Sequence, residues 1–159
     1  MMSEAPILIA YDGSDPARQC ISEAAKLFKS RPCVVMTVWE PGLAYAISVP
    51  ASSLDGLSPG VVDVEAAQET DEAISGRAER IANDGAELAR SAGLQAEAIA
   101  VAEAAGVSNA ITDRAEEIDA AAIVIGSRGL GGLRARLEGS TSSRVLKHAR
   151  CPVLLVHHD

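Results

Sequence analysis

Aromatic residues are scarce in this sequence. Phe, Tyr and Trp together make up 3% of its 159 residues, although the hydrophobic fraction reaches 48%. The core must therefore be built from Ala, Val, Ile and Leu. Because a chain of this length buries most of the surface that it exposes when unfolded, that core needs no disulfide or structural metal. The composition favours alanine-faced helices lying close against a sheet of branched aliphatic residues.

Long apolar runs and basic charge are also lacking. No run approaches the roughly 20 apolar residues that cross a membrane, and the first residues carry no basic segment of the kind that opens a signal peptide. The formal net charge is −8, which repels nucleic-acid backbones and anionic membranes. We therefore expect a cytoplasmic protein that binds neither nucleic acid nor membrane.

Cysteines and histidines are few and poorly placed for chemistry. The cysteines are Cys20, Cys33 and Cys151, and the histidines are His148, His157 and His158. An odd number of cysteines without metal-ligand spacing indicates reduced, buried thiols. Because no histidine precedes residue 148, no Ser–His–Asp set can be placed at a strand end. A metal site among the histidines is the weaker interpretation, since no Cys or carboxylate joins them at ligand spacing. No catalytic residue is predicted.

Apolar runs of strand length alternate with stretches of helical period. Strands are expected over 7–11, 33–39, 95–101, 121–125 and 152–156, and helices over 16–28, 63–91, 107–118 and 140–149. Alternating helices and uninterrupted apolar strands indicate a parallel sheet covered on both faces. The alanines of 95–101 would also suit a helix, which makes that strand the weakest of the five.

Two of these helices carry clear start and face signals. Asp15 is expected to cap the helix that begins at Pro16, since proline fits the first helical position. In the helix over 63–91, an apolar stripe is expected to face the core, an interpretation that we prefer to a coiled-coil seam. The stripe consists of Ile74, Ala78, Ile81, Gly85, Leu88 and Ala92.

The carboxyl ends of the strands are the expected place for a ligand. Parallel sheets bind ligands there, where the strand order reverses. The segments at those ends are Asp12-Gly13-Ser14, Trp39-Glu40 and the glycine-rich stretch from Gly126. The stretch 40–62 is longer than most connections in compact domains, and no site residue is assigned to it.

The most informative segment is this glycine-rich stretch. Gly126 and Gly129 come where a phosphate chain must approach the backbone, and any Cβ there would hold the phosphates away. Gly139 and Ser140 open the last helix, whose free amides and positive dipole end favour an anion. A P-loop is excluded because its Lys-Ser/Thr pair is missing, and a dinucleotide fingerprint would follow the first strand instead. On these grounds alone, a plain loop with a Ser/Thr helix cap is an equal alternative.

The spacing adds a family resemblance. Gly126-x-x-Gly129, followed after nine residues by Gly139-Ser140, resembles the G-2x-G-9x-G-(S/T) signature of the ATP-binding branch of the universal stress protein family. The first strand leads into Asp12-Gly13-Ser14 and the chain closes with the run 151–156, as in members of that family. The resemblance covers nearly the whole chain.

This resemblance implies a fold, a ligand and an assembly. The fold is α/β, a single Rossmann-like domain over residues 1–159 with a five-stranded parallel sheet in the order 3-2-1-4-5. The ligand is ATP with Mg²⁺ or Mn²⁺, and two copies pair as a homodimer through the last strand, Pro152 to Val156. The implied nucleotide-binding residues are Asp12, Val38, Ile125, Gly126, Ser127, Arg128, Gly129, Gly139, Ser140, Thr141 and Ser142. The backbone around Val38 and Ile125 would contact adenine, and Asp12 would lie near the ribose, the phosphates or the metal.

As a member of that family, the chain would be a nucleotide-dependent regulatory module of the stress response. Two other functions stay open: a slow ATPase or nucleotide hydrolase of the same fold, and an interaction dimer whose glycine turn holds no nucleotide. Single residues also have plainer interpretations. Asp12 can serve as a helix cap, Arg128 as a solvated loop residue, and Trp39 can pack a loop instead of stacking on the base.

Valine at either of two glycines tests the glycine turn. We expect Gly129→Val and Gly139→Val each to abolish ATP binding while the protein stays folded, because a side chain there blocks the approach of phosphate to the backbone amides. Isothermal titration calorimetry measures the affinity, with Ser143→Ala as the control that changes it little. Unchanged affinity in both valine variants would mean that the turn is only structural.

Overall fold

The computed structural model describes residues 4–41, 64–127 and 141–157, with the side chains of the second range from Thr70 onward. Strands and helices alternate along them. The strands are β1 (Ile7–Ala10), β2 (Pro32–Trp39), β3 (Gln95–Ala102), β4 (Ala122–Gly126) and β5 (Val153–Val156). The helices are α1 (Asp15–Phe28), α3 (Val64–Ser91), α4 (Val107–Glu117) and α5 (Thr141–His148). The alanine-rich segment from Gln95 is thus a strand, as its position in the alternation predicts.

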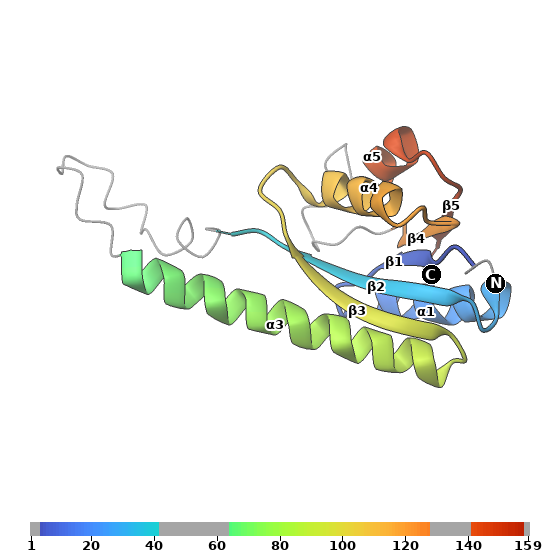
Figure 1. Ribbon diagram of the computed structural model, residues 1–159, viewed down its shortest axis with the longest axis horizontal. Helices are drawn as coiled ribbons and strands as arrows, with labels where there is room; N and C mark the ends of the chain where they lie inside the picture. The colour runs from blue at the N-terminus through green and yellow to red at the C-terminus, as the bar shows by residue number, and fades with distance from the viewer. Residues whose placement is uncertain (1–3, 42–63, 128–140, 158–159) are drawn as a thin grey trace.

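The five strands form one parallel sheet in the order β3-β2-β1-β4-β5. This confirms the predicted α/β class and the strand order 3-2-1-4-5. Helices α1 and α3 cover one face of the sheet, while α4 and α5 cover the other (Figure 1). The N-terminal part of α3 extends past the edge of the sheet (Figure 1). Within the described ranges, no helix is both long and apolar enough to cross a membrane.

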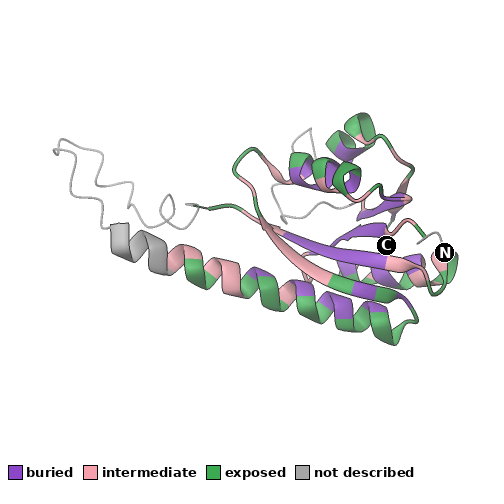
Figure 2. Ribbon diagram, in the orientation of Figure 1, coloured by how far each residue is buried: buried purple, intermediate pink, exposed green. Residues whose placement is uncertain are grey.

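Two aliphatic clusters, one on each face, make up the core. Ile7, Ile9 and Val35 pack with the alanines of α1 and α3, and Leu8 and Met36 pack against α4 and α5. All four residues of β1 are buried, as the colouring of the central strands in Figure 2 shows. The central strand β1 is therefore covered on both faces, as expected of an apolar strand in a parallel sheet.

The start of α1 differs from the prediction. Asp15 is already the first residue of the helix, and the cap is Ser14, whose side chain accepts a hydrogen bond from the Ala17 N–H at 3.3 Å. Ser14 has the extended backbone (φ −72°, ψ 162°) that an N-cap residue requires. Pro16 lies in the first turn, where its missing N–H costs nothing.

The buried face of α3 matches the predicted stripe only in part, at Ala78 and Gly85. Leu88 is 39% exposed, and the helix instead buries a row of small residues. These residues are Ala78, Ala82, Gly85, Ala86 and Ala89. Leu27, at the end of α1, is likewise 61% exposed. Small side chains occupy this face because they let the helix axis lie closer to the sheet. The closer approach buries more of the strand side chains beneath the helix.

Gly85 marks the closest approach of α3 to the sheet. A Cβ added to this residue would lie 2.6 Å from Tyr11 Cδ1 and 2.9 Å from Val35 Cγ1, distances that real Cβ atoms do not adopt. The Tyr11 ring is 1% exposed and occupies the space that the glycine leaves. Helical glycine costs about 1 kcal/mol relative to alanine, so its presence here reflects packing and not helix propensity.

Alanine at Gly85 should therefore destabilise the fold. Overpacking outweighs the gain in helix propensity, and we expect a net loss of about 1–2 kcal/mol in the free energy of unfolding. The matched control is Gly76→Ala on the same helix, where the nearest atom to a new Cβ is the flexible end of Arg80 at 3.6 Å. Urea denaturation should show the control equal to or more stable than the wild type. A Gly85→Ala protein as stable as this control would contradict the packing.

Candidate functional site

The sheet has a gap at the carboxyl edge of its central strand. The ladder between β1 and β2 pairs Ala10 with Met36 and closes with the Tyr11 N–H donating to the Met36 carbonyl at 2.9 Å. The ladder between β1 and β4 ends where Ile9 pairs with Val124. Both flanking strands continue further, β2 to Trp39 and β4 to Gly126. The gap thus lies at the point where the strand order reverses, the usual ligand site of open parallel sheets.

Main-chain groups of the two flanking strands face this gap. In a parallel ladder, alternate residues direct their N–H and C=O to opposite neighbours. Because Met36 bonds toward β1, Val38 faces the same way, beyond the end of β1. On β4, the Ile123 N–H and the Ser127 N–H donate to β5 carbonyls, both at 2.9 Å, so Ile125 faces β5 and Gly126 faces the gap. Val38 and Gly126 therefore present backbone donors and acceptors to one space.

Asp12 lies in the turn that leaves β1 beneath this gap. Its Oδ1 accepts hydrogen bonds from the Ser14 N–H at 2.9 Å and from the Ser14 hydroxyl. Gly13 between them has φ +82°, a conformation that favours glycine. Asp12 was alternatively expected to serve as a helix cap. It takes part in the cap indirectly, because its carboxylate holds Ser14, and Ser14 is the residue that caps α1.

Tyr11 and Thr37 support this turn, and neither was predicted as a residue of the site. The Thr37 hydroxyl, in a residue 5% exposed, donates to the Tyr11 carbonyl at 2.9 Å. Burial raises the pKa of the Tyr11 phenol, an effect that Arg18 opposes and Asp84 reinforces. A buried tyrosine in a chain with so few aromatic residues is the one signal that could have identified this position.

The other residues that were predicted for the site lie partly inside and partly outside the described segments. Thr141 opens α5, and Ser142 is buried in its first turn at 4% exposure. Trp39 is half-buried at the end of β2, and its carbonyl accepts from the Glu103 N–H at 3.0 Å. Four predicted site residues lie outside the described residues. They are Arg128, Gly129, Gly139 and Ser140.

A divalent cation fits Asp12 only together with a nucleotide. Within the described ranges, no three His, Cys, Asp or Glu side chains gather as a metal-binding group. Mg²⁺ is commonly held by one or two carboxylates and the phosphates of its substrate, and one carboxylate beside phosphates needs a cation between them to offset their repulsion. Asp12 is thus suited to a shared metal and not to a site formed by the protein alone.

The thiols take no part in this site. Burial raises the pKa of Cys20 to about 11, with a further contribution from the Asp12 carboxylate, and burial raises that of Cys33 to about 12. Both are buried and carry no disulfide, as predicted, whereas Cys151 is partly exposed. Because the thiolate is the reactive form, Cys20 and Cys33 are inert at neutral pH.

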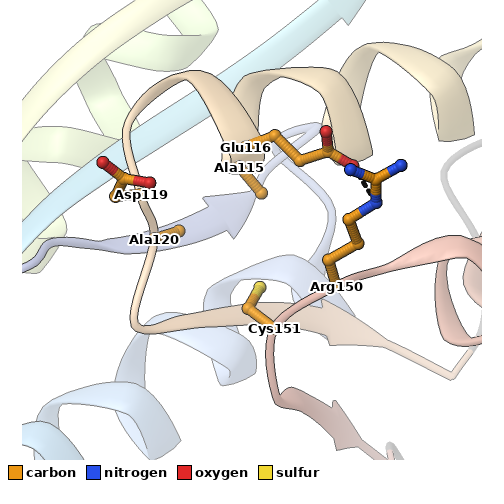
Figure 3. Close-up of a pocket in the computed structure, with 6 residues that line it drawn as sticks. All are labelled: Ala115, Glu116, Asp119, Ala120, Arg150 and Cys151. Carbon is orange, nitrogen blue, oxygen red and sulfur yellow. Dashed lines mark ion pairs between the residues drawn. The ribbon is translucent and has the colours of Figure 1, made fainter.

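A hollow of about 380 Å³ lies at the opposite edge of the sheet. Figure 3 shows its lining, which comes from the end of α4 and from the segments that lead into β4 and β5. The lining residues are Ala115, Glu116, Asp119, Ala120, Arg150 and Cys151. Its one ion pair joins Arg150 Nε to Glu116 Oε1 at 3.2 Å between exposed side chains, and such pairs contribute little to stability. Because the lining residues lie before β4 and β5, at the amino ends of these strands, the hollow is separate from the gap at the carboxyl end of β1.

The fold defines an open parallel α/β protein of the Rossmann-like class, a class in which ligands bind at the switch point of the strand order. The family is equally clear, since the model of the universal stress protein family matches residues 5–157. The chain belongs to the universal stress protein family.

Relatives and solved structures agree with this placement. The chain is 31% identical over 151 residues to universal stress protein YxiE of Bacillus subtilis, covering 94% of this chain and 97% of that protein. The structure of hypothetical protein MJ0577 is similar in fold, with a TM-score of 0.73 at 19% identity and 99% of each chain covered. A universal stress protein from Archaeoglobus fulgidus in complex with dAMP is 25% identical, with a TM-score of 0.59 and 97% and 98% of the two chains covered.

Removing the Ser14 hydroxyl tests the turn that holds Asp12. Ser14→Ala should lower the free energy of unfolding by about 1 kcal/mol, the usual effect of losing an N-cap side chain. Ser22, exposed on the same helix, supplies the control: Ser22→Ala should be neutral or slightly stabilising because alanine is the better helix former. Urea denaturation that ranks the two variants equally would contradict the assigned cap.

Proposed function

We propose that this chain binds an adenine nucleotide, ATP with Mg²⁺ or Mn²⁺, in the gap above β1. The observation that carries the proposal is the pair of backbone edges at Val38 and Gly126, which face one another across the end of the shorter central strand. Adenine presents both a hydrogen-bond donor and acceptors along its edge, so backbone N–H and C=O groups can recognise it. Family membership and the dAMP complex of the Archaeoglobus fulgidus protein support the choice of an adenine nucleotide.

The remaining predicted residues receive roles that follow from this placement. Gly126 and Val38 contact the base, and Asp12 lies near the ribose, the phosphates or the shared cation. The stretch from Ser127 to Gly129 and the segment Gly139 to Ser142 line the triphosphate. The positive end of the α5 dipole would add a favourable electrostatic contribution to binding the anion.

The proposed activity is regulation and not catalysis. Rapid phosphoryl transfer requires a placed metal, a cation on the developing charge and a group that orients the attacking water. Asp12 and Arg128 are candidates for the first two, and we assign no residue to the third. The protein would thus act as a cytoplasmic nucleotide-dependent module of the stress response, a single domain over residues 1–159, with ATP turnover well below about one per second.

Thermal stability in the presence of nucleotides tests the ligand. Mg-ATP at a hundred times its dissociation constant should raise the free energy of unfolding by roughly 2.7 kcal/mol. Mg-GTP at the same concentration is the control and should have a much smaller effect, because the backbone edge is suited to adenine. Differential scanning fluorimetry measures both. An unmoved melting temperature at millimolar Mg-ATP would refute the proposed function.

We also propose that two copies pair through the open edge of β5. Leu154 and Val156 direct their main-chain groups to β4, so Val153 and Leu155 present theirs to the outside. An unpaired apolar edge favours pairing with its twofold mate. The side chains of Leu154 and Val156 lie in the core cluster under α1, so they are unsuitable for testing the contact.

Proline in β5 tests this pairing. Val153→Pro removes an outward N–H while leaving the ladder to β4 intact, because prolines are tolerated on the open side of an edge strand. We expect the wild type to sediment as a dimer and this variant as a monomer with unchanged circular dichroism. A wild type that sediments as a monomer at micromolar concentration would rule out the proposed dimer.

A further inference from the structure

Tyr11, the residue before Asp12, is fixed by three separate contacts. Its N–H donates to the Met36 carbonyl and its own carbonyl accepts from the Thr37 hydroxyl, both at 2.9 Å. Its ring fills the space over Gly85, where a Cβ would come within 2.6 Å of Cδ1. The backbone leading into Asp12 is therefore held by β2 on one side and by α3 on another.

Helix α3 also borders the next residue of the turn. A Cβ on Gly13 would lie 3.6 Å from Cγ2 of Ile81, one helical turn before Gly85. Ile81 and Gly85 share a face of α3, since residues four apart are neighbours on a helix. The turn from Tyr11 to Gly13 thus lies against the same stripe of α3 at two points, with room at Gly13 for no more than an ordinary van der Waals contact.

From these contacts we infer that Gly85 and Thr37 are positioning residues for Asp12 and thereby set the affinity of the site for its nucleotide. The inference rests on the proposed nucleotide site and adds the contacts that regulate it. Consecutive Cα atoms are fixed about 3.8 Å apart, so a shift of Tyr11 moves Asp12 as well. Hydrogen bonds and charge contacts weaken steeply when a group is displaced by about 1 Å. The position of α3 is thus transmitted to the nucleotide through one tyrosine.

A double-mutant cycle separates positioning from general destabilisation. The affinity for Mg-ATP is measured by calorimetry at 10 °C for the wild type, Gly85→Ala, Asp12→Asn and the double variant, after circular dichroism shows each to be folded. We expect Gly85→Ala to weaken binding about tenfold, within the usual range of coupling between sites. Asp12→Asn should weaken binding about tenfold in the wild type, as for the loss of a charged contact, and less than about twofold in the Gly85→Ala background. Gly76→Ala, on the same helix but away from the turn, is the control with unchanged affinity.

Three results would overturn the inference. One is a folded Gly85→Ala protein with wild-type affinity, and another is a cycle in which the two losses simply multiply, as a merely structural role predicts. If Gly85→Ala does not fold, Thr37→Val takes its place, because it removes the hydroxyl that donates to Tyr11 and keeps the side-chain shape. Wild-type affinity in that variant is the third contrary result, and a several-fold loss supports the inference. A wild type that does not bind Mg-ATP refutes the proposed function as well, whereas the three results above leave that function standing.

Discussion

The packing of the Tyr11 ring into the space left by Gly85 is the constraint on which the carboxyl edge of the sheet and its candidate site depend. It lets α3 lie close on the sheet and fixes the end of β1 at the level of Met36. Because β1 stops there while its neighbours continue, the backbone edges of Val38 and Gly126 are left facing one gap. The same contact places Asp12, whose carboxylate then organises Ser14 and the start of α1. Core packing and the candidate site are thus parts of one arrangement.

The electrostatics of this edge suit a bound anion only when a cation accompanies it. The chain carries a net charge of −8, and the proposed site has Asp12 near the phosphates. In that proposal, backbone amides and a shared divalent ion would hold the triphosphate, and free anions that bring no metal would bind less well. The proposal is therefore a nucleotide sensor and not a general phosphate binder. It also explains why a site with a single carboxylate does not require a metal centre of its own.

Patterns that depend on strand and helix periods could be predicted from the sequence. Four of the strands follow from apolar runs, and the strand from Gln95 follows from its position in the alternation. The strand order follows from the family resemblance carried by Gly126, Gly129 and Gly139. Details that depend on tertiary packing could not be predicted. The predicted stripe of α3 includes Ala78 and Gly85, which are buried, but also Leu88, which is exposed. The close approach at Tyr11 selects small residues on this helix in place of the leucine. The cap of α1 is Ser14, which Asp12 orients through two hydrogen bonds across Gly13. This local turn over Asp12-Gly13-Ser14 is a sequence signal that the choice of Asp15-Pro16 overlooked.

The sequence also could not predict which backbone groups face the gap. The resemblance placed the base near Val38 and Ile125, and only the register of β4 with β5 shows that Gly126 faces the gap and Ile125 faces the neighbouring strand.

An amide titration by two-dimensional NMR tests the central claim most directly. When Mg-ATP is added to ¹⁵N-labelled protein, we predict that the largest shifts occur at Val38, Gly126 and the turn from Asp12 to Ser14, with little change around Glu116 and Cys151 at the opposite edge. Shifts confined to that opposite edge, or no shifts at saturating nucleotide, would contradict the account.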